Sequence, residues 1–138
     1  MQILLIDTCG WIDFLRPATG STNSLGDLVE QAISDDSAAM CGVSVAELLQ
    51  GAKGKKEKQQ LELLFATVPV LAIESADWHA AGLALQALRT RGITVPLTDA
   101  LIAAVALRNN VPLLTVDAHF EHLGVERRRI GASSAKRN

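Results

Sequence analysis

Apolar residues along this 138-residue chain form two kinds of pattern, which alternate from the N-terminus onwards. Short, nearly continuous apolar runs at residues 2–6 and 37–41 predict buried strands, because a strand covered on both faces has no polar side. Elsewhere apolar residues recur every three or four positions, which is the spacing of one helix face. The predicted helices span residues 24–34, 44–49, 56–66, 75–91 and 100–107, with further extended segments at 68–71 and 111–116.

Two of these helices have residues suited to capping their first turn. Ser44, followed three positions later by Glu47, matches a capping box, in which a hydroxyl and a carboxylate accept hydrogen bonds from free amides. Thr98 or Asp99 suits the cap of helix 100–107, whose residues are nearly all apolar. A helix that is apolar on most sides is predicted to be buried on most sides.

Strands that alternate with helices predict an α/β fold, with a central, mostly parallel sheet and helices on both of its faces. The length fits a single domain, and we expect residues 1–130 to form it and residues 131–138 to be a flexible tail. The carboxyl ends of parallel strands share one edge of a sheet, where open α/β folds bind their ligands. We therefore expect the residues that follow strands 2–6 and 111–116 to lie close together.

The composition favours a globular protein over a disordered or membrane-spanning one. Apolar residues make up 49% of the chain and charged residues 20%, a balance typical of a globular protein rather than a disordered one. No apolar run approaches the ~20 residues of a membrane span, and the N-terminus lacks a signal-peptide pattern, so we expect a cytoplasmic protein. The two cysteines, Cys9 and Cys41, are expected to be reduced, and they are too few for a zinc cluster.

Four acidic residues stand where an apolar run stops or a helix begins: Asp7, Glu47, Asp99 and Asp117. Taken singly, Glu47 and Asp99 are most simply explained by helix capping. Asp7 and Asp117 each follow an apolar strand directly, where a carboxylate contributes little to packing. Several carboxylates at one sheet edge would repel one another unless a cation joined them, and Mg²⁺ and Mn²⁺ prefer oxygen ligands. The four acids together therefore predict a divalent-metal site.

For other polar residues, the sequence gives weaker evidence of a role in this metal site. The hydroxyls of Thr8, Ser44 and Thr115 adjoin the acids in sequence, and can either orient metal ligands and waters or satisfy local backbone groups. Cys9 lies two positions after Asp7, yet no histidine or metal motif activates it. The histidines lie outside any obvious catalytic motif, which favours surface or core roles over ligand roles. They are His79, His119 and His122.

Each of the four acids lies within a longer segment, and these segments span residues 5–12, 44–51, 97–104 and 114–120. In this order and spacing, the chain resembles the PIN-domain ribonucleases, and most closely the toxin component of VapBC-type toxin–antitoxin pairs. Each segment alone is weak, whereas four in order are quite specific. One departure is the pair Cys9–Gly10, where the family more often has a hydroxyl or amide residue followed by a larger one.

The resemblance implies a small α/β domain that cleaves RNA with the help of Mg²⁺ or Mn²⁺. Its core acids would be Asp7, Glu47 and Asp99, with Asp117 as the fourth. It also implies a homodimer and a cognate antitoxin whose tail enters the active site. Basic residues available for RNA-backbone contacts, each equally well explained as part of a solvated helix face, are Lys53, Lys55, Lys56, Arg89 and Arg91.

Two other classes of function stay open from the sequence. A non-cleaving module of the same fold could bind RNA or a protein partner, and loss of a core acid would favour it; all four acids are present. A phosphatase or receiver-like signalling domain also places an aspartate after its first strand. The phosphatase pattern needs a second acid two positions later, and Cys9 occupies that position.

Overall fold

The computed structural model describes residues 2–17 and 24–128, so the predicted tail at 131–138 lies outside the described residues. Within them, one sheet has the strand order β3-β2-β1-β4-β5, and every pairing in it is parallel, as the sequence pattern predicted. Its strands are β1 (Leu4–Ile6), β2 (Ala38–Cys41), β3 (Val70–Leu71), β4 (Leu113–Leu114) and β5 (Arg127–Arg128).

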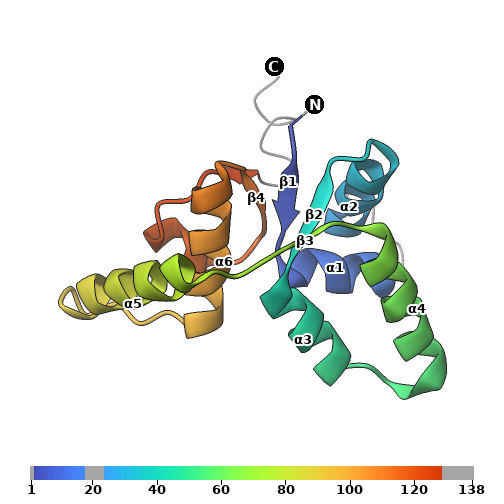
Figure 1. The fold of residues 1–138 in the computed structure, drawn as a ribbon, viewed down its shortest axis with the longest axis horizontal. Helices are drawn as coiled ribbons and strands as arrows, with labels where there is room; N and C mark the ends of the chain where they lie inside the picture. Colours follow the sequence, from blue (N-terminus) through green and yellow to red (C-terminus); the bar gives the residue numbers. More distant parts are fainter. Residues whose placement is uncertain (1, 18–23, 129–138) are drawn as a thin grey trace.

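Helices cover both faces of the sheet, which confirms the predicted α/β architecture (Figure 1). In chain order they are α1 (Thr8–Leu15), α2 (Leu25–Ser34), α3 (Gly42–Gln50), α4 (Gly54–Thr67), α5 (Ser75–Arg89), α6 (Leu97–Asn109) and a short 3-10 helix, η1 (Ala118–His122). On one side of the sheet lie α1, α2 and α4, and on the other lie α5 and α6. None of the helices in the described ranges combines the length and apolar character that crossing a membrane requires.

Strand β1 contributes side chains to two hydrophobic cores, one on each face of the sheet. Its central residue, Leu5, packs with the residues of α6, whereas Leu4 and Ile6 pack with those of α1 and α2. All three are buried, which explains why the strand reads as a continuous apolar run. Helix α6 is buried from Ala100 to Ala106, as its almost wholly apolar composition predicted.

The predicted capping box at the start of α3 is wrong. The helix begins at Gly42, and its N-cap is Cys41, the last residue of β2. Cys41 already has the extended φ and ψ of an N-cap, −90° and 148°, so the chain passes from strand to helix without a loop. Ser44 and Glu47 therefore lie inside the helix, where their side chains are free to make other contacts.

The predicted cap of α6 is also wrong. This helix begins at Leu97, directly after Pro96, whose φ of −64° is fixed by its ring. Asp99 consequently lies in the first turn rather than at the cap, and Pro96 provides no side-chain hydrogen bond. A carboxylate in the first turn of a helix lies near its positive end, which favours a negative charge there.

Helix α1 follows β1 without a loop, and the apolar pattern did not predict it. Asp7 is its N-cap and accepts the backbone N–H of Thr8 over 2.8 Å. At Gly10 a Cβ would approach the Ile6 side chain to 2.7 Å, so glycine allows close packing of the helix on the strand. The indole of fully buried Trp11 donates to the Ile6 carbonyl over 3.1 Å. Packing therefore accounts for the small residue at position 10.

Candidate functional site

The four predicted acids come from four elements, and the structure brings them together to different degrees. Asp7 follows β1 and Asp117 follows β4, which are neighbouring parallel strands with their carboxyl ends at one edge. Glu47 lies on α3 and Asp99 in the first turn of α6. Asp99 and Asp117 share one tight cluster, Asp7 interacts electrostatically with both, and Glu47 is connected through hydroxyl groups.

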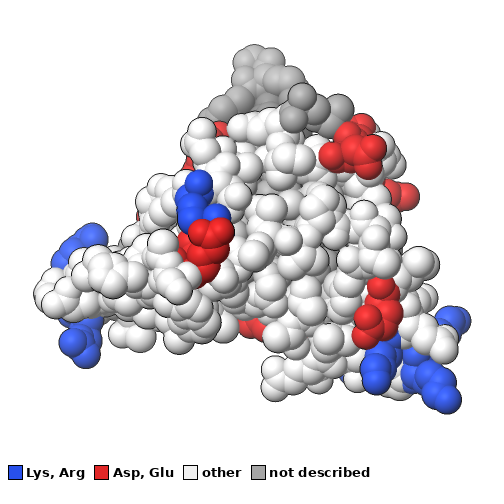
Figure 2. Space-filling view, viewed as in Figure 1, with Lys and Arg blue, Asp and Glu red and all other residues white. Residues whose placement is uncertain are grey.

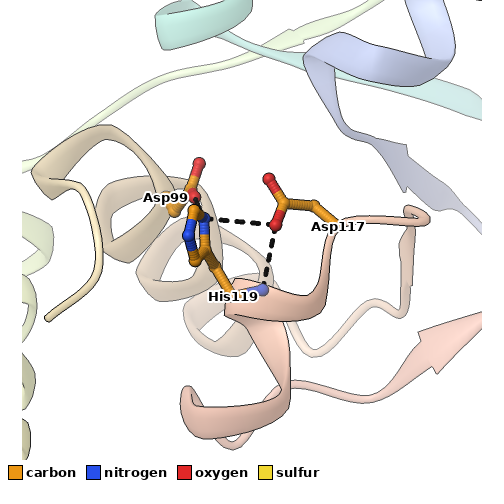
Figure 3. Close-up of side chains that lie close together, drawn as sticks. All are labelled: Asp99, Asp117 and His119. Carbon is orange, nitrogen blue, oxygen red and sulfur yellow. Dashed lines mark hydrogen bonds and ion pairs between the residues drawn. The ribbon is translucent and has the colours of Figure 1, made fainter. Parts of the chain in front are cut away.

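His119 lies against two of these acids (Figure 3). Its Nδ1 atom is 2.8 Å from Asp99 Oδ2 and 3.1 Å from Asp117 Oδ1. The same Asp117 oxygen accepts the backbone N–H of His119 over 2.9 Å. Asp117 therefore caps η1, and this bond places His119 next to it. One donor atom from each of the three residues lies within 4.8 Å of the others.

The sequence interpretation missed His119, for which it favoured a surface or core role. The position was included in the fourth matching segment, two residues after Asp117, but no local pattern distinguishes it from His122. What places the ring at the site is the η1 turn together with Asp99, which lies 20 residues away in sequence. His79, on α5, and His122, at the end of η1, are exposed and are not part of this cluster.

Asp7 is a buried carboxylate, with 4% of its surface exposed. It accepts hydrogen bonds from the Thr115 hydroxyl over 2.8 Å, the Thr8 amide over 2.8 Å and the Cys9 thiol over 3.2 Å. Burial raises the pKa of Asp7, and the charge of Asp117 raises it further, while these hydrogen bonds act in the opposite direction. The chain therefore bears an energetic cost to keep a charge at this position.

Asp99 has a similar electrostatic environment. Burial raises its pKa, the negative charges of Asp117 and Asp7 add to that effect, and the hydrogen bond from His119 opposes it. The pKa of His119 is raised in turn, first by its hydrogen bond to Asp99 and then by the charge of Asp117. Asp7, Asp99 and Asp117 therefore act on one another as a group, although their side chains come from different elements.

Glu47 joins the site through hydroxyl groups. The Thr8 hydroxyl donates to Glu47 Oε1 over 2.6 Å, and Thr8 directly follows Asp7. The Thr8 oxygen also lies 2.8 Å from the hydroxyl of Ser44, which is fully buried one turn before Glu47. The Thr115 hydroxyl donates to Asp7. The three hydroxyls singled out in the sequence, those of Thr8, Ser44 and Thr115, therefore each contact an acid or another of the three at this sheet edge.

Cys9 takes part as a hydrogen-bond donor. Its thiol lies 3.2 Å from Asp7 Oδ2 and 3.8 Å from the Thr115 hydroxyl. Burial, reinforced by the charge of Asp7, raises the pKa of Cys9 to about 11. The group is therefore a neutral thiol at ordinary pH, which fits the sequence expectation of a cysteine without nucleophilic activation. Here the thiol supplies the hydrogen bond that a hydroxyl would supply.

The donor set at this edge suits a hard divalent cation. Among the residues described, no lysine or arginine forms an ion pair with any of the four acids, and His119 is the single basic partner. Carboxylate oxygens are the ligands that Mg²⁺ and Mn²⁺ prefer. A doubly charged ion would offset the repulsion and the burial that raise the pKa values of Asp7 and Asp99.

Two comparisons by sequence identify proteins that this chain resembles. Residues 4–126 match the family described as PIN domain. Ribonuclease VapC11 from Mycobacterium tuberculosis is 36% identical over 123 residues, which cover 86% of this chain and 90% of that protein. VapC ribonuclease Mb1587 from Mycobacterium bovis gives the same values.

Solved structures share the fold at lower identity. One is VapBC2 from Rickettsia felis bound to a fragment of promoter DNA, with a TM-score of 0.75, 18% identity, and coverage of 94% of this chain and 99% of that one. Another is DNA-bound VapBC from Salmonella typhimurium, with a TM-score of 0.74, 18% identity, and coverage of 94% and 98%. Because the family match extends from β1 almost to β5, this chain belongs to the PIN domain family.

Proposed function

We propose that this protein is an endoribonuclease that hydrolyses RNA phosphodiester bonds with a divalent cation held by Asp7, Glu47, Asp99 and Asp117. We also propose that it is the toxin of a toxin–antitoxin pair. The observation that carries the proposal is the convergence of carboxylates from four elements on one sheet edge, without lysine or arginine partners among the described residues. The relatives named above at 36% identity are ribonucleases, and the structural neighbours are toxin–antitoxin complexes.

The chemistry assigns separate tasks to these residues. A bound Mg²⁺ or Mn²⁺ lowers the pKa of a water and stabilises the charge that develops on the phosphoryl group. Asp7 is held rigidly by three donors, so it presents a fixed carboxylate to the site. Asp117 has 37% of its side chain exposed, compared with 14% for Asp99, and is therefore better placed to accept a proton from an attacking water and pass it to solvent.

Basic side chains lie on two sides of the molecule and are our candidates for contacts with the RNA backbone. Figure 2 shows Lys and Arg gathered at the far end of α5 and near the α3–α4 corner, with a mostly uncharged surface between them. Arg89 ends α5, and Lys55 and Lys56 lie in the first turn of α4. Contacts with phosphates add affinity without selecting a sequence, so these residues would position the strand rather than choose the cleavage site.

The test is incubation of the purified chain with defined RNAs, with Mg²⁺ or Mn²⁺ and with a chelator. We expect cleavage that needs the cation and that is abolished in Asp7→Asn and in Asp99→Asn, while circular dichroism shows that both variants fold. Asp36→Asn is a matched control, because this exposed aspartate has a φ of 58°, which asparagine also tolerates. Cleavage that persists with the chelator, or in both variants, would exclude this function.

Other outcomes would point to another class of protein. Binding of RNA without cleavage, at any cation concentration, would favour the non-cleaving module. Hydrolysis of a simple phosphate ester in place of RNA would favour a phosphatase. Both results would have to be obtained on the same folded sample that the nuclease assay uses.

A homodimer and a cognate antitoxin complete the proposal. Large apolar side chains remain exposed on α4 and α5, with Leu63 at 71%, Leu83 at 55% and Trp78 at 53%. We take these side chains as candidates for contacts with another protein chain. Light scattering on the purified chain will test for the dimer. Co-purification with the product of a small adjacent reading frame, followed by loss of nuclease activity, will test for the antitoxin.

A further inference from the structure

Building on the proposed function, we propose that His119 is itself a metal ligand and that it makes the site prefer a first-row transition ion, such as Mn²⁺, over Mg²⁺. The ligand group would be Asp99, Asp117 and His119, which adds a nitrogen donor to a set of acids. The proposal concerns the choice of cation, which the four carboxylates alone leave open.

Two of the three distances within this group match those between neighbouring ligands of one ion. In an octahedral site with metal–ligand bonds of about 2.1 Å, adjacent donor atoms lie about 3.0 Å apart. The Nδ1 atom of His119 is 2.8 Å from Asp99 Oδ2 and 3.1 Å from Asp117 Oδ1. The ring nitrogen therefore has the separation from each oxygen that a shared cation would require.

The His119 Nδ1 atom lies so close to two carboxylates that a proton or a cation must lie between them. A bare lone pair on Nδ1 would be repelled by two carboxylates this close. A single proton on Nδ1 points well toward one oxygen at a time, so it is shared between Asp99 and Asp117. A cation in its place would interact with the nitrogen and both carboxylates at once.

Backbone hydrogen bonds at the start of η1 hold His119 in this position, and the next residue, Phe120, is buried in the core. The Thr115 hydroxyl accepts the Asp117 amide over 2.9 Å, and Asp117 Oδ1 accepts the His119 amide over 2.9 Å. These bonds fix the start of η1. The Asp117 carboxylate and the His119 imidazole therefore both project from one short turn. The His119 side chain is 46% exposed, so burial does not explain why its ring turns toward Asp99.

A nitrogen ligand changes which cation is favoured. Mg²⁺ binds oxygen almost exclusively and keeps several of its waters. Imidazole suits the later first-row ions, such as Fe²⁺, Ni²⁺ and Zn²⁺, and affinity for mixed nitrogen and oxygen sites is lowest for Mn²⁺ and rises along the row. A site that offers two carboxylates and an imidazole therefore discriminates against Mg²⁺, whereas a site of carboxylates alone does not.

Electron paramagnetic resonance of Mn²⁺ bound to the full chain tests this directly, because electron spin echo modulation reports a nitrogen bonded to the ion. We expect nitrogen modulation in the native protein, and a changed pattern when histidine is labelled with nitrogen-15, which requires no substitution. His119→Gln should abolish the modulation and weaken Mn²⁺ binding at least ~10-fold. Its effect on Mg²⁺ binding should be less than about 2-fold, because Mg²⁺ makes little use of nitrogen.

His122→Gln is the matched control, since His122 is exposed on the same short helix and lies outside the cluster. It should keep both the modulation and the affinity for Mn²⁺. Mn²⁺ that binds the native protein without nitrogen modulation would overturn the role of His119 and leave the proposed nuclease intact. Failure of both Mn²⁺ and Mg²⁺ to bind would overturn the proposed function as well.

Discussion

The hydroxyl of Thr8 lies 2.6 Å from Glu47 Oε1, and so links the acid on α3 to the end of strand β1. Its oxygen is also 2.8 Å from the buried hydroxyl of Ser44. Thr8 donates its single hydroxyl proton to Glu47, so Ser44 donates to the Thr8 oxygen. Two hydroxyls in series therefore fix a flexible side chain relative to Asp7, which precedes Thr8 in the chain.

Thr8→Val removes this link while keeping the size and branching of the side chain. Glu47 would lose its donor and Ser44 its acceptor, which should lower the free energy of unfolding by about 1 kcal/mol. We expect kcat for RNA cleavage to fall by roughly 10- to 100-fold with little change in KM, as when groups that orient metal ligands are removed. Thr8→Ser keeps the hydroxyl and should restore kcat. Equal kcat values in all three proteins would mean that the link is only structural.

Asp7 should make the metal-free protein less stable at neutral pH. Burial raises its pKa, and for an acid this means that the stability it contributes is present in full below the unfolded pKa, and is lost as the pH rises through the folded pKa. Asp7→Asn removes the charge and keeps a good N-cap for α1. In chelator at pH 7, the variant should therefore be more stable than the native chain.

Urea unfolding from pH 3.5 to pH 7 will measure this difference. The gap between the two proteins should be small at the acid end and should widen as the pH rises. Mn²⁺ should then stabilise the native chain and have little effect on Asp7→Asn. A gap that is independent of pH would show that the carboxylate of Asp7 is not destabilised by its burial.

The apolar pattern and the four acids predicted a large share of this architecture. Residues 2–6 and 37–41 are strands in a parallel sheet, and the long helices appear where apolar residues recur at helical spacing. That information is local, because periodicity over a few turns is enough to define a buried face. Two short elements were missed, β5 with two residues and η1 with five, too few for any period to emerge, and helix α1 was missed as well.

The failures at the site have a different cause. The starts of α3 and α6 depend on where a strand ends and on Pro96, so residues with good capping chemistry at positions 44 and 99 were assigned to caps they do not form. His119 depends on three-dimensional proximity to Asp99, which no sequence period encodes. Local propensity therefore predicted the elements, while tertiary contacts determined what the polar side chains do.

Asp77 and Arg108 should form the strongest polar link between α5 and α6. Asp77 is 1% exposed and accepts from Arg108 Nε over 2.8 Å and Nη2 over 2.9 Å. Arg108→Ala would leave the buried Asp77 carboxylate with the Glu74 amide as its remaining donor, and should lower the free energy of unfolding by roughly 3 kcal/mol. Glu74→Gln is the control, because Glu74 is 59% exposed at 3.3 Å from the same guanidinium and should cost under about 0.5 kcal/mol. Similar losses of stability in both variants would refute the assignment.

Cys9 should resist alkylation despite its place beside the proposed site. With a pKa of about 11, only ~0.1% of the thiol is ionised at pH 8, and the thiolate fraction grows only as the pH approaches 11. Cys9→Ser keeps a donor toward Asp7 and should retain cleavage to within about 3-fold. Mass spectrometry after iodoacetamide treatment will measure the labelling. Rapid modification at pH 8 would show that the thiol is more exposed or more acidic than its contacts indicate.

The basic residues at the start of α4 and the end of α5 should affect binding rather than chemistry. Lys53, Lys55 and Lys56 lie at the start of α4, and Arg89 and Arg91 lie at the end of α5, all exposed. Replacing either set with glutamine should raise KM for RNA several-fold and leave kcat within about 2-fold, because phosphate contacts position the strand without touching the scissile bond. For single-stranded RNA, removing one basic side chain that binds a phosphate should also reduce the slope of log affinity against log salt by about 0.7. Binding curves at several salt concentrations will measure that slope, and an unchanged slope would assign these side chains to a solvated surface alone.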